Sequence, residues 1–258
     1  MPDNQPHTVG LFVTCLADLI RPSVAFSTIT LLEDAGCRVE VPLEQTCCGQ
    51  PAYNNGAIDD TRPLARQVIQ RFAEYPYVVT PSGSCAGMIK HHYPKLFEEY
   101  PQWRARAEDL AARTWEITSF LVEVMDYQPP QLAEEDRERA ITYHDSCAGL
   151  RELGIKQQPR TLLQRSGANL AEMQSTEVCC GFGGTFCTKM PEISEKMVSD
   201  KLEQARATGA ELLLGGDLGC LMNISGRASR MGDTLEVRHI TELLAGQLDG
   251  PAIGEGET

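Results

Sequence analysis

Ten cysteines occur in this chain of 258 residues, and eight of them fall into two sets with matching spacing. The sets are Cys15, Cys47, Cys48 and Cys85, and Cys147, Cys179, Cys180 and Cys220. Each set reads C-x31-CCG and ends with one more cysteine, Cys85 in the first and Cys220 in the second. Thiolates are good ligands for zinc and for iron–sulfur clusters. The pattern therefore predicts metal or redox sites rather than scattered core cysteines.

The spacing extends to a repeat of the whole chain. Three cysteines of the first set recur in the second at one common offset, and the fourth recurs at an offset only three residues longer. Neighbouring residues repeat as well, because TCLADLIRP (14–22) aligns with SCAGLRELG (146–154). Such self-similarity indicates duplication. We expect one cysteine-rich repeat at residues 1–127 and a second at 139–250, joined by a Pro-rich and then charged linker.

Short apolar runs alternate with amphipathic stretches in both repeats. Strands are predicted at 7–15, 37–43, 77–81, 139–147 and 169–173, and helices at 22–36, 57–74, 159–167 and 191–208. This alternation predicts an α/β fold of two pseudo-symmetric repeats, each a small, mostly parallel sheet flanked by helices. Residues 91–125 look like a helical hairpin, and the last ten residues are expected to be disordered.

The predicted elements place the cysteines at strand ends. Cys15, Cys85 and Cys147 follow strands directly or within a few residues, and each CCG lies on a loop between a strand and a helix. Sites in open α/β sheets form at the carboxyl ends of the strands. Four cysteines that are distant in the sequence are therefore expected to converge at one edge of each repeat.

The adjacent cysteines bear on the kind of group that is bound. Structural zinc sites usually draw on C-x2–4-C pairs, and no C-x-x-C occurs here. If adjacent side chains point apart, they bind two irons of a cluster more easily than one zinc ion. This favours an iron–sulfur cluster, with zinc as the alternative. Thiol–disulfide catalysis, which usually uses C-x-x-C near a helix start, is a third alternative.

Composition limits the partners and the compartment. The net charge of −13 argues against nucleic acid binding through a basic patch. The sequence contains no apolar stretch of about 18 residues, so no membrane span is predicted. The first residues do not resemble a signal peptide. We expect the protein to be cytoplasmic. Disulfides are disfavoured in the cytoplasm, so the ten cysteines need another explanation.

The two C-x31-CCG units resemble the cysteine-rich CCG domain of heterodisulfide reductase and of the glycolate oxidase iron–sulfur subunit. Longer strings, among them GCRVEVPLEQTCCGQPAYNNG, PSGSCAGMIKHHYP and DLGCLMNISGR, are most similar to the lactate utilization protein A family. The resemblance covers nearly the whole chain.

The resemblance implies an iron–sulfur electron-transfer subunit of a complex that oxidises L-lactate to pyruvate. Such a protein is part of an oxidoreductase of the lactate dehydrogenase type that does not use NAD. Its cofactor would be one or two [4Fe-4S] clusters held by the eight cysteines. Its partners would be a ferredoxin-like iron–sulfur protein and a third subunit. The alternatives are a thiol/disulfide redox subunit of the heterodisulfide reductase type and a zinc-stabilised scaffold.

The sequence departs from the heterodisulfide reductase pattern at a few positions. In that enzyme each motif ends with C-x-x-C, whereas Ser82 and Asp217 occupy the extra positions here, which leaves four cysteines per repeat. Cys187 is a candidate fifth ligand in the second repeat. His144 and Asp145 precede Cys147 and either tune a bound group by hydrogen bonding or form a plain polar pair at a strand end. Cys37 is expected to be a core thiol.

Overall fold

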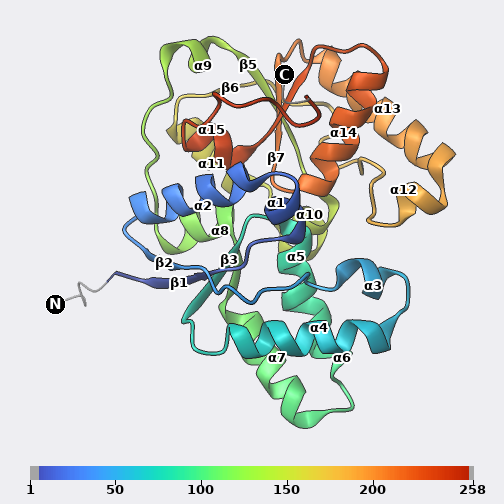
Figure 1. Ribbon diagram of the computed structural model, residues 1–258. Coiled ribbons are helices and arrows are strands. Elements are labelled where there is room, and N and C mark those ends of the chain that lie inside the picture. The colour runs from blue at the N-terminus through green and yellow to red at the C-terminus, as the bar shows by residue number, and fades with distance from the viewer. Residues whose placement is uncertain (1–5, 256–258) are drawn as a thin grey trace. The chain divides into compact units, whose positions relative to one another are not determined.

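The computed structural model describes residues 6–255, and the chain divides into two compact units, Met1–Tyr127 and Gln128–Thr258. Each unit contains one four-stranded sheet with helices around it (Figure 1). Within the described residues, no helix is both long enough and apolar enough to cross a membrane.

The sheet of unit 1 is entirely parallel, in the order β2-β1-β3-β4. Its strands are β1 (Thr8–Leu11), β2 (Arg38–Glu40), β3 (Tyr77–Thr80) and β4 (Thr114–Glu116). The central strand β1 pairs through Val9 with Val39 of β2 and with Tyr77 of β3. Both central strands bury three of their four residues, which is why they read as short apolar runs.

Helices connect and cover these strands. They are α1 (Cys15–Leu19), α2 (Pro22–Asp34), α3 (Gln50–Asn54), α4 (Ile58–Arg71), α5 (Gly83–Gly87), α6 (Tyr93–Leu96), α7 (Pro101–Arg113) and α8 (Ile117–Ser119), with π-helical turns at Met88–His92 and Phe120–Val124. Pro22 opens α2, and Gly36, with a φ of +86°, follows its end. The predicted helices at 22–36 and 57–74 are therefore confirmed within a few residues.

Unit 2 repeats the same topology. Its parallel sheet has the order β6-β5-β7-β8, so the first strand of each unit lies between the second and the third. The strands are β5 (Ala140–His144), β6 (Asn169–Leu170), β7 (Leu212–Gly215) and β8 (Glu236–His239). The helices are α9 (Glu134–Glu138), α10 (Cys147–Leu153), α11 (Gln157–Arg165), α12 (Phe186–Lys189), α13 (Pro191–Ala207), α14 (Leu218–Arg230) and α15 (Ile240–Leu244). The prediction of two α/β repeats with parallel sheets is confirmed.

Two expectations about local structure are wrong. The stretch 91–125 is not a plain helical hairpin, because β4 lies within it and completes the sheet beside β3. The tail is ordered as far as it is described: Ala252 and Ile253 are buried, and the Ile253 N–H donates to the carbonyl of Val237. Arg238 also donates to the carbonyls of residues 248, 250 and 251 and fixes the tail against β8. Residues 256–258 lie outside the described part.

Candidate metal centres

The four paired cysteines of unit 1 meet at the carboxyl end of its sheet. Cys15 begins α1 just after β1, and Cys85 lies in α5 just after β3. Cys47 and Cys48 lie on the loop between β2 and α3. The sulfur of Cys15 is 3.7 Å from that of Cys47, and the sulfur of Cys48 is 3.4 Å from that of Cys85. The predicted convergence of this set is therefore present in the structure.

Helix caps set the positions of the two strand-end cysteines. The hydroxyl of Thr14 accepts a hydrogen bond from the Ala17 N–H and caps α1 at the residue before Cys15. The hydroxyl of Ser82 accepts from the N–H of Cys85 at 3.2 Å and caps α5. Such caps satisfy N–H groups that a helix start leaves unpaired. Ser82 thus has a structural task at a position where the heterodisulfide reductase pattern has cysteine.

The CCG loop directs both of its thiols toward the same group of cysteines. Gly49 has a φ of +85°, and its N–H donates to the sulfur of Cys47 at 3.4 Å. The sulfur of Cys47 also lies within hydrogen-bonding range of both Cys15 and Cys48. The expectation that adjacent cysteines point apart is wrong here, because the loop lacks the alternation of a strand. The hydroxyl of the buried Tyr93 donates to the carbonyl of Cys48 at 2.8 Å and fixes the loop.

These contacts separate the acidities of the thiols. Hydrogen bonds from Cys15, Cys48 and the Gly49 N–H lower the pKa of Cys47 to about 3. The pKa of Cys15 is raised, first by its hydrogen bond to Cys47 and then by burial. The pKa of Cys48 is raised by the same kind of contact with Cys47 and Cys85. Cys47 is therefore a thiolate beside the protonated Cys15 and Cys48, and a metal cation that binds there displaces protons from these two thiols.

Unit 2 builds the same arrangement. Cys147 begins α10 after β5, Cys220 lies in the first turn of α14 after β7, and the Cys179–Cys180 pair lies on the loop between β6 and α12. Gly181 has a φ of +83°, and its N–H donates to the sulfur of Cys179 at 3.4 Å. A hydrogen bond from Cys147 and others from Cys180 and Gly181 lower the pKa of Cys179 to about 2.

A different residue holds the CCG loop of unit 2. The side-chain amide of Asn223, on α14, donates to the carbonyl of Cys180 at 2.8 Å. Tyr93 makes the corresponding bond in unit 1, and it lies on α6. Both units thus anchor the second CCG cysteine through its carbonyl, which leaves its sulfur free for other contacts.

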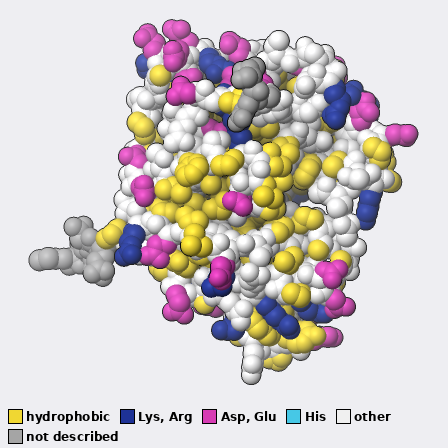
Figure 2. Space-filling view, in the orientation of Figure 1, with side chains coloured by type: hydrophobic (Ala, Val, Ile, Leu, Met, Phe, Trp, Pro, Cys, Tyr) yellow, Lys and Arg dark blue, Asp and Glu magenta, His cyan; other side chains and the backbone are white. Residues whose placement is uncertain are grey.

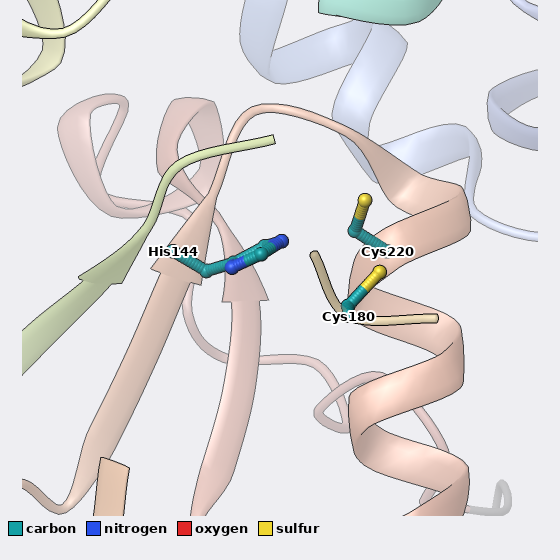
Figure 3. A group of neighbouring side chains, drawn as sticks. All are labelled: His144, Cys180 and Cys220. Atoms are coloured by element: carbon teal, nitrogen blue, oxygen red, sulfur yellow. The ribbon is translucent and has the colours of Figure 1, made fainter. Parts of the chain in front are cut away.

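A histidine adjoins the thiols of unit 2. One ring nitrogen of His144 and the sulfurs of Cys180 and Cys220 lie within 4.8 Å of one another, and all three residues are buried. Figure 3 shows the imidazole at the end of β5 pointing toward the two sulfurs. Burial, followed by the nearby charge of Lys201, lowers the pKa of His144 to about 4, so the ring is neutral at pH 7.

Two other buried polar residues near the cysteines of unit 2, Asp145 and Lys201, have defined partners. Asp145 is buried and forms a two-pronged ion pair with Arg160, with N–O distances of 2.9 and 3.0 Å. Lys201 is fully buried on α13, and its Nζ donates to the carbonyls of Ser175 and Thr176 at 2.7 and 3.2 Å. Asp145 is therefore a structural partner of Arg160. Sequence reasoning missed Lys201, although a lysine three residues after Val198 on the apolar face of a helix was a usable signal.

Three remaining predicted positions have clear surroundings. Asp217 is the N-cap of α14, which matches the place of Ser82 before α5. The thiol of Cys187 donates to the carbonyl of Gly184 at 3.4 Å, so its role as a fifth ligand stays a prediction. Cys37 is buried 3.8 Å from the sulfur of Met125, as expected of a core thiol.

Both halves of the chain match the family model of the CCG cysteine-rich domain, over residues 9–90 and 141–225. A lactate utilization protein A of Shouchella clausii is 49% identical over 237 residues, which cover 92% of this chain and 98% of that protein. The chain belongs to the lactate utilization protein A family. A second member, from Halalkalibacterium halodurans, is 47% identical over 92% of this chain and 96% of its own length. The predicted resemblance is confirmed.

A solved structure supports the fold independently. A hypothetical protein from Helicobacter pylori superimposes with a TM-score of 0.69 at 13% identity, covering 98% of this chain and 50% of that chain. At this identity the likeness concerns the fold alone. In this member of the lactate utilization protein A family, the grouped cysteines of both CCG domains are suited to metal binding.

Proposed function

We propose that the protein is an iron–sulfur electron-transfer subunit of a complex that oxidises L-lactate to pyruvate. The observation that supports this is the gathering of four cysteine sulfurs at one sheet end in each unit of a lactate utilization protein A family member. The ligands are Cys15, Cys47, Cys48 and Cys85 in unit 1 and Cys147, Cys179, Cys180 and Cys220 in unit 2. When bound, the clusters pass single electrons, and the chain works in an oxidoreductase that does not use NAD.

The donor set fits clusters of the [4Fe-4S] type, because each unit offers four thiols, and four cysteines complete such a cluster. In each set two cysteines are buried and two are partly exposed. A bound group is thereby shielded on one side and open to a redox partner on the other. Because the ligands must be reduced thiols, the proposal includes a cytoplasmic location.

An exposed apolar surface in unit 1 supports association with other subunits. Leu19, Phe26 and Leu43 are large hydrophobic residues with more than half of their surface exposed. Figure 2 shows hydrophobic side chains gathered over this part of unit 1. Leu19 and Leu43 also line a cleft of about 280 Å³ together with Cys15 and Cys47. We infer that the ferredoxin-like partner docks here, because electron transfer needs close approach to these cysteines, while a third subunit completes the complex.

Metal analysis tests the proposal. Protein purified without oxygen is expected to be brown and to contain iron and acid-labile sulfide. Cys48→Ser is expected to remove the iron of unit 1 and Cys180→Ser that of unit 2, while Cys37→Ser, the matched core thiol, leaves both. Iron content unchanged by both ligand substitutions would contradict the ligand assignment. Leu43→Glu is expected to weaken copurification with partner subunits at unchanged iron content.

Zinc is the second candidate, and one observation favours it. Ligands of a tetrahedral zinc ion with Zn–S bonds of about 2.3 Å lie about 3.8 Å apart. The Cys15–Cys47 sulfur distance of 3.7 Å is close to that value. If the protein is colourless and contains stoichiometric zinc after anaerobic cluster reconstitution, the sites bind zinc instead of iron–sulfur clusters. A thiol/disulfide subunit of the heterodisulfide reductase type would instead reduce a disulfide substrate at the cluster.

A further inference from the structure

The two cysteine sites rest on different residues. Val9 pairs with Tyr77 in unit 1, and Ile141 pairs with Leu212 in unit 2. These two pairs occupy equivalent positions, so Val9 corresponds to Ile141. Counting three residues onward places Phe12 of unit 1 at the position of His144 in unit 2. Each lies three residues before the first cysteine of its set, and each is buried. An apolar ring in one unit is thus an imidazole in the other.

The imidazole of His144 lacks the partners that a buried histidine needs. The residue is 1% exposed, and neither ring nitrogen has a hydrogen-bond partner among residues 6–255. Leaving a buried polar group unpaired is unfavourable, because nothing replaces the hydrogen bonds that it makes with water. By contrast, the equally buried His239 pairs its Nδ1 with the hydroxyl of Thr241 at 2.8 Å. A residue that only fills space at position 144 does not need nitrogen, as Phe12 demonstrates.

Two ligand-type sulfurs lie within reach of the His144 ring. A ring nitrogen lies within 4.8 Å of the sulfurs of Cys180 and Cys220, which themselves lie within the same distance of each other (Figure 3). Metal–nitrogen bonds of about 2.0 Å and metal–sulfur bonds of about 2.3 Å place such donors between about 3 and 4 Å apart. Small side-chain movements therefore bring all three donors onto one metal atom.

We propose that His144 is a nitrogen ligand of the metal group in unit 2, beside Cys180 and Cys220, so that the two units bind chemically different groups. This rests on the proposed function, in which both units hold metal. It assigns the extra donor of unit 2 to His144 rather than to Cys187, whose thiol contacts the carbonyl of Gly184. Unit 1 has Phe12 at this position and binds its group through sulfur alone.

The test uses the full-length chain with Cys48→Ser, so that unit 2 holds the remaining iron. Pulsed EPR on protein labelled with ¹⁵N-histidine is expected to show the coupling of a directly bound nitrogen. His144→Gln and His144→Phe are expected to abolish this coupling while iron remains on the cysteines. The second variant copies the residue of unit 1 and should preserve the fold. His91→Gln, at an exposed position, is the control and should leave the coupling intact.

Iron in unit 2 without nitrogen coupling, or coupling that survives both substitutions, would overturn the assignment and leave the proposed function standing. A weak coupling typical of a hydrogen bond to cluster sulfur would overturn it as well. Absence of iron from the native protein would overturn the proposed function instead. In that case X-ray absorption of the Co²⁺-loaded protein decides: nitrogen lost on His144→Gln supports the ligand, and sulfur alone refutes it.

Discussion

The sulfurs of Cys15 and Cys47 lie 3.7 Å apart although the two residues are 32 positions apart in the sequence. The parallel sheet brings them together, because β1 and β2 are neighbours and their carboxyl ends face the same edge. Cys147 and Cys179 form the same hydrogen-bonded pair in unit 2. Because the geometry is shared, the lowered pKa of the first cysteine in each CCG motif can be tested in the metal-free protein.

Cys47 and Cys179 are expected to react first with iodoacetamide at pH 6. Their pKa values are lowered to about 3 and about 2 by hydrogen bonds from neighbouring thiols and from glycine N–H groups, and the thiolate is the nucleophile. Burial raises the pKa of Cys37 to about 11, so it should react more slowly than Cys47 and Cys179. Peptide mapping by mass spectrometry measures the order. In urea the differences should vanish, and equal rates in the folded protein would contradict the hydrogen-bonded arrangement.

Gly181→Ala is expected to destabilise unit 2 by about 2–4 kcal/mol. Its φ of +83° alone costs an L-residue about 1–2 kcal/mol, and an added Cβ would lie 2.8 Å from the carbonyl oxygen of Ser194. Gly209 is the matched control, with a φ of +72° and open space around its Cβ position. Gly209→Ala should therefore cost only about 1–2 kcal/mol. Urea unfolding of both variants measures the difference, and equal losses would show that the close contact has no effect.

The convergence of the two cysteine sets was predictable because the signal is carried by residue type and spacing. Cysteine is rare, and the common offset that relates Cys15 to Cys147 and Cys47 to Cys179 exposes the duplication in the sequence alone. The strands that precede Cys15 and Cys147 were predictable for a related reason, since their buried runs are bounded by polar residues. Both signals are local or periodic, so no knowledge of tertiary contacts is needed.

The buried charge near the cysteines of unit 2 was harder to predict. Lys201 of α13 is held by carbonyls that are 25 and 26 residues away in sequence. The strand β4 was missed because Thr114–Glu116 is too short to show alternation, and only its pairing with β3 defines it. Both features arise from tertiary packing, which overrides local pattern.

Glu236→Gln is expected to lower the free energy of unfolding at pH 7 by about 1–3 kcal/mol. Burial alone raises the pKa of Glu236, but hydrogen bonds from Arg238 and Arg139 outweigh it and lower the pKa below 4.5. A lowered carboxyl pKa stabilises the fold above the unfolded pKa, and this stabilisation is lost as pH falls through the folded pKa. The native protein should therefore lose stability below about pH 4.5, and the variant should lose less.

Thermal unfolding between pH 3 and pH 7 measures this dependence. Glu195→Gln is the matched control, because Glu195 pairs with Arg227 through a largely exposed carboxylate. Exposed ion pairs contribute about 0–1 kcal/mol, so this variant should follow the native curve. Parallel curves for Glu236→Gln and the native protein would contradict the role assigned to the two arginines.

Lys201→Met is expected to lower the reduction potential of the unit 2 group and to leave that of unit 1 unchanged. The ammonium group is buried close enough to interact electrostatically with Cys179, Cys180 and Cys220. At an effective dielectric constant of about 20, a unit charge at about 10 Å contributes roughly 1–2 kcal/mol, or about 40–90 mV for one electron. A positive charge favours the reduced, more negative group. Redox titration followed by EPR measures the shift, with Lys196→Met, an exposed lysine of α13, as the control. Equal potentials in the Lys201 variant and the native protein would show that this charge does not act on the unit 2 group.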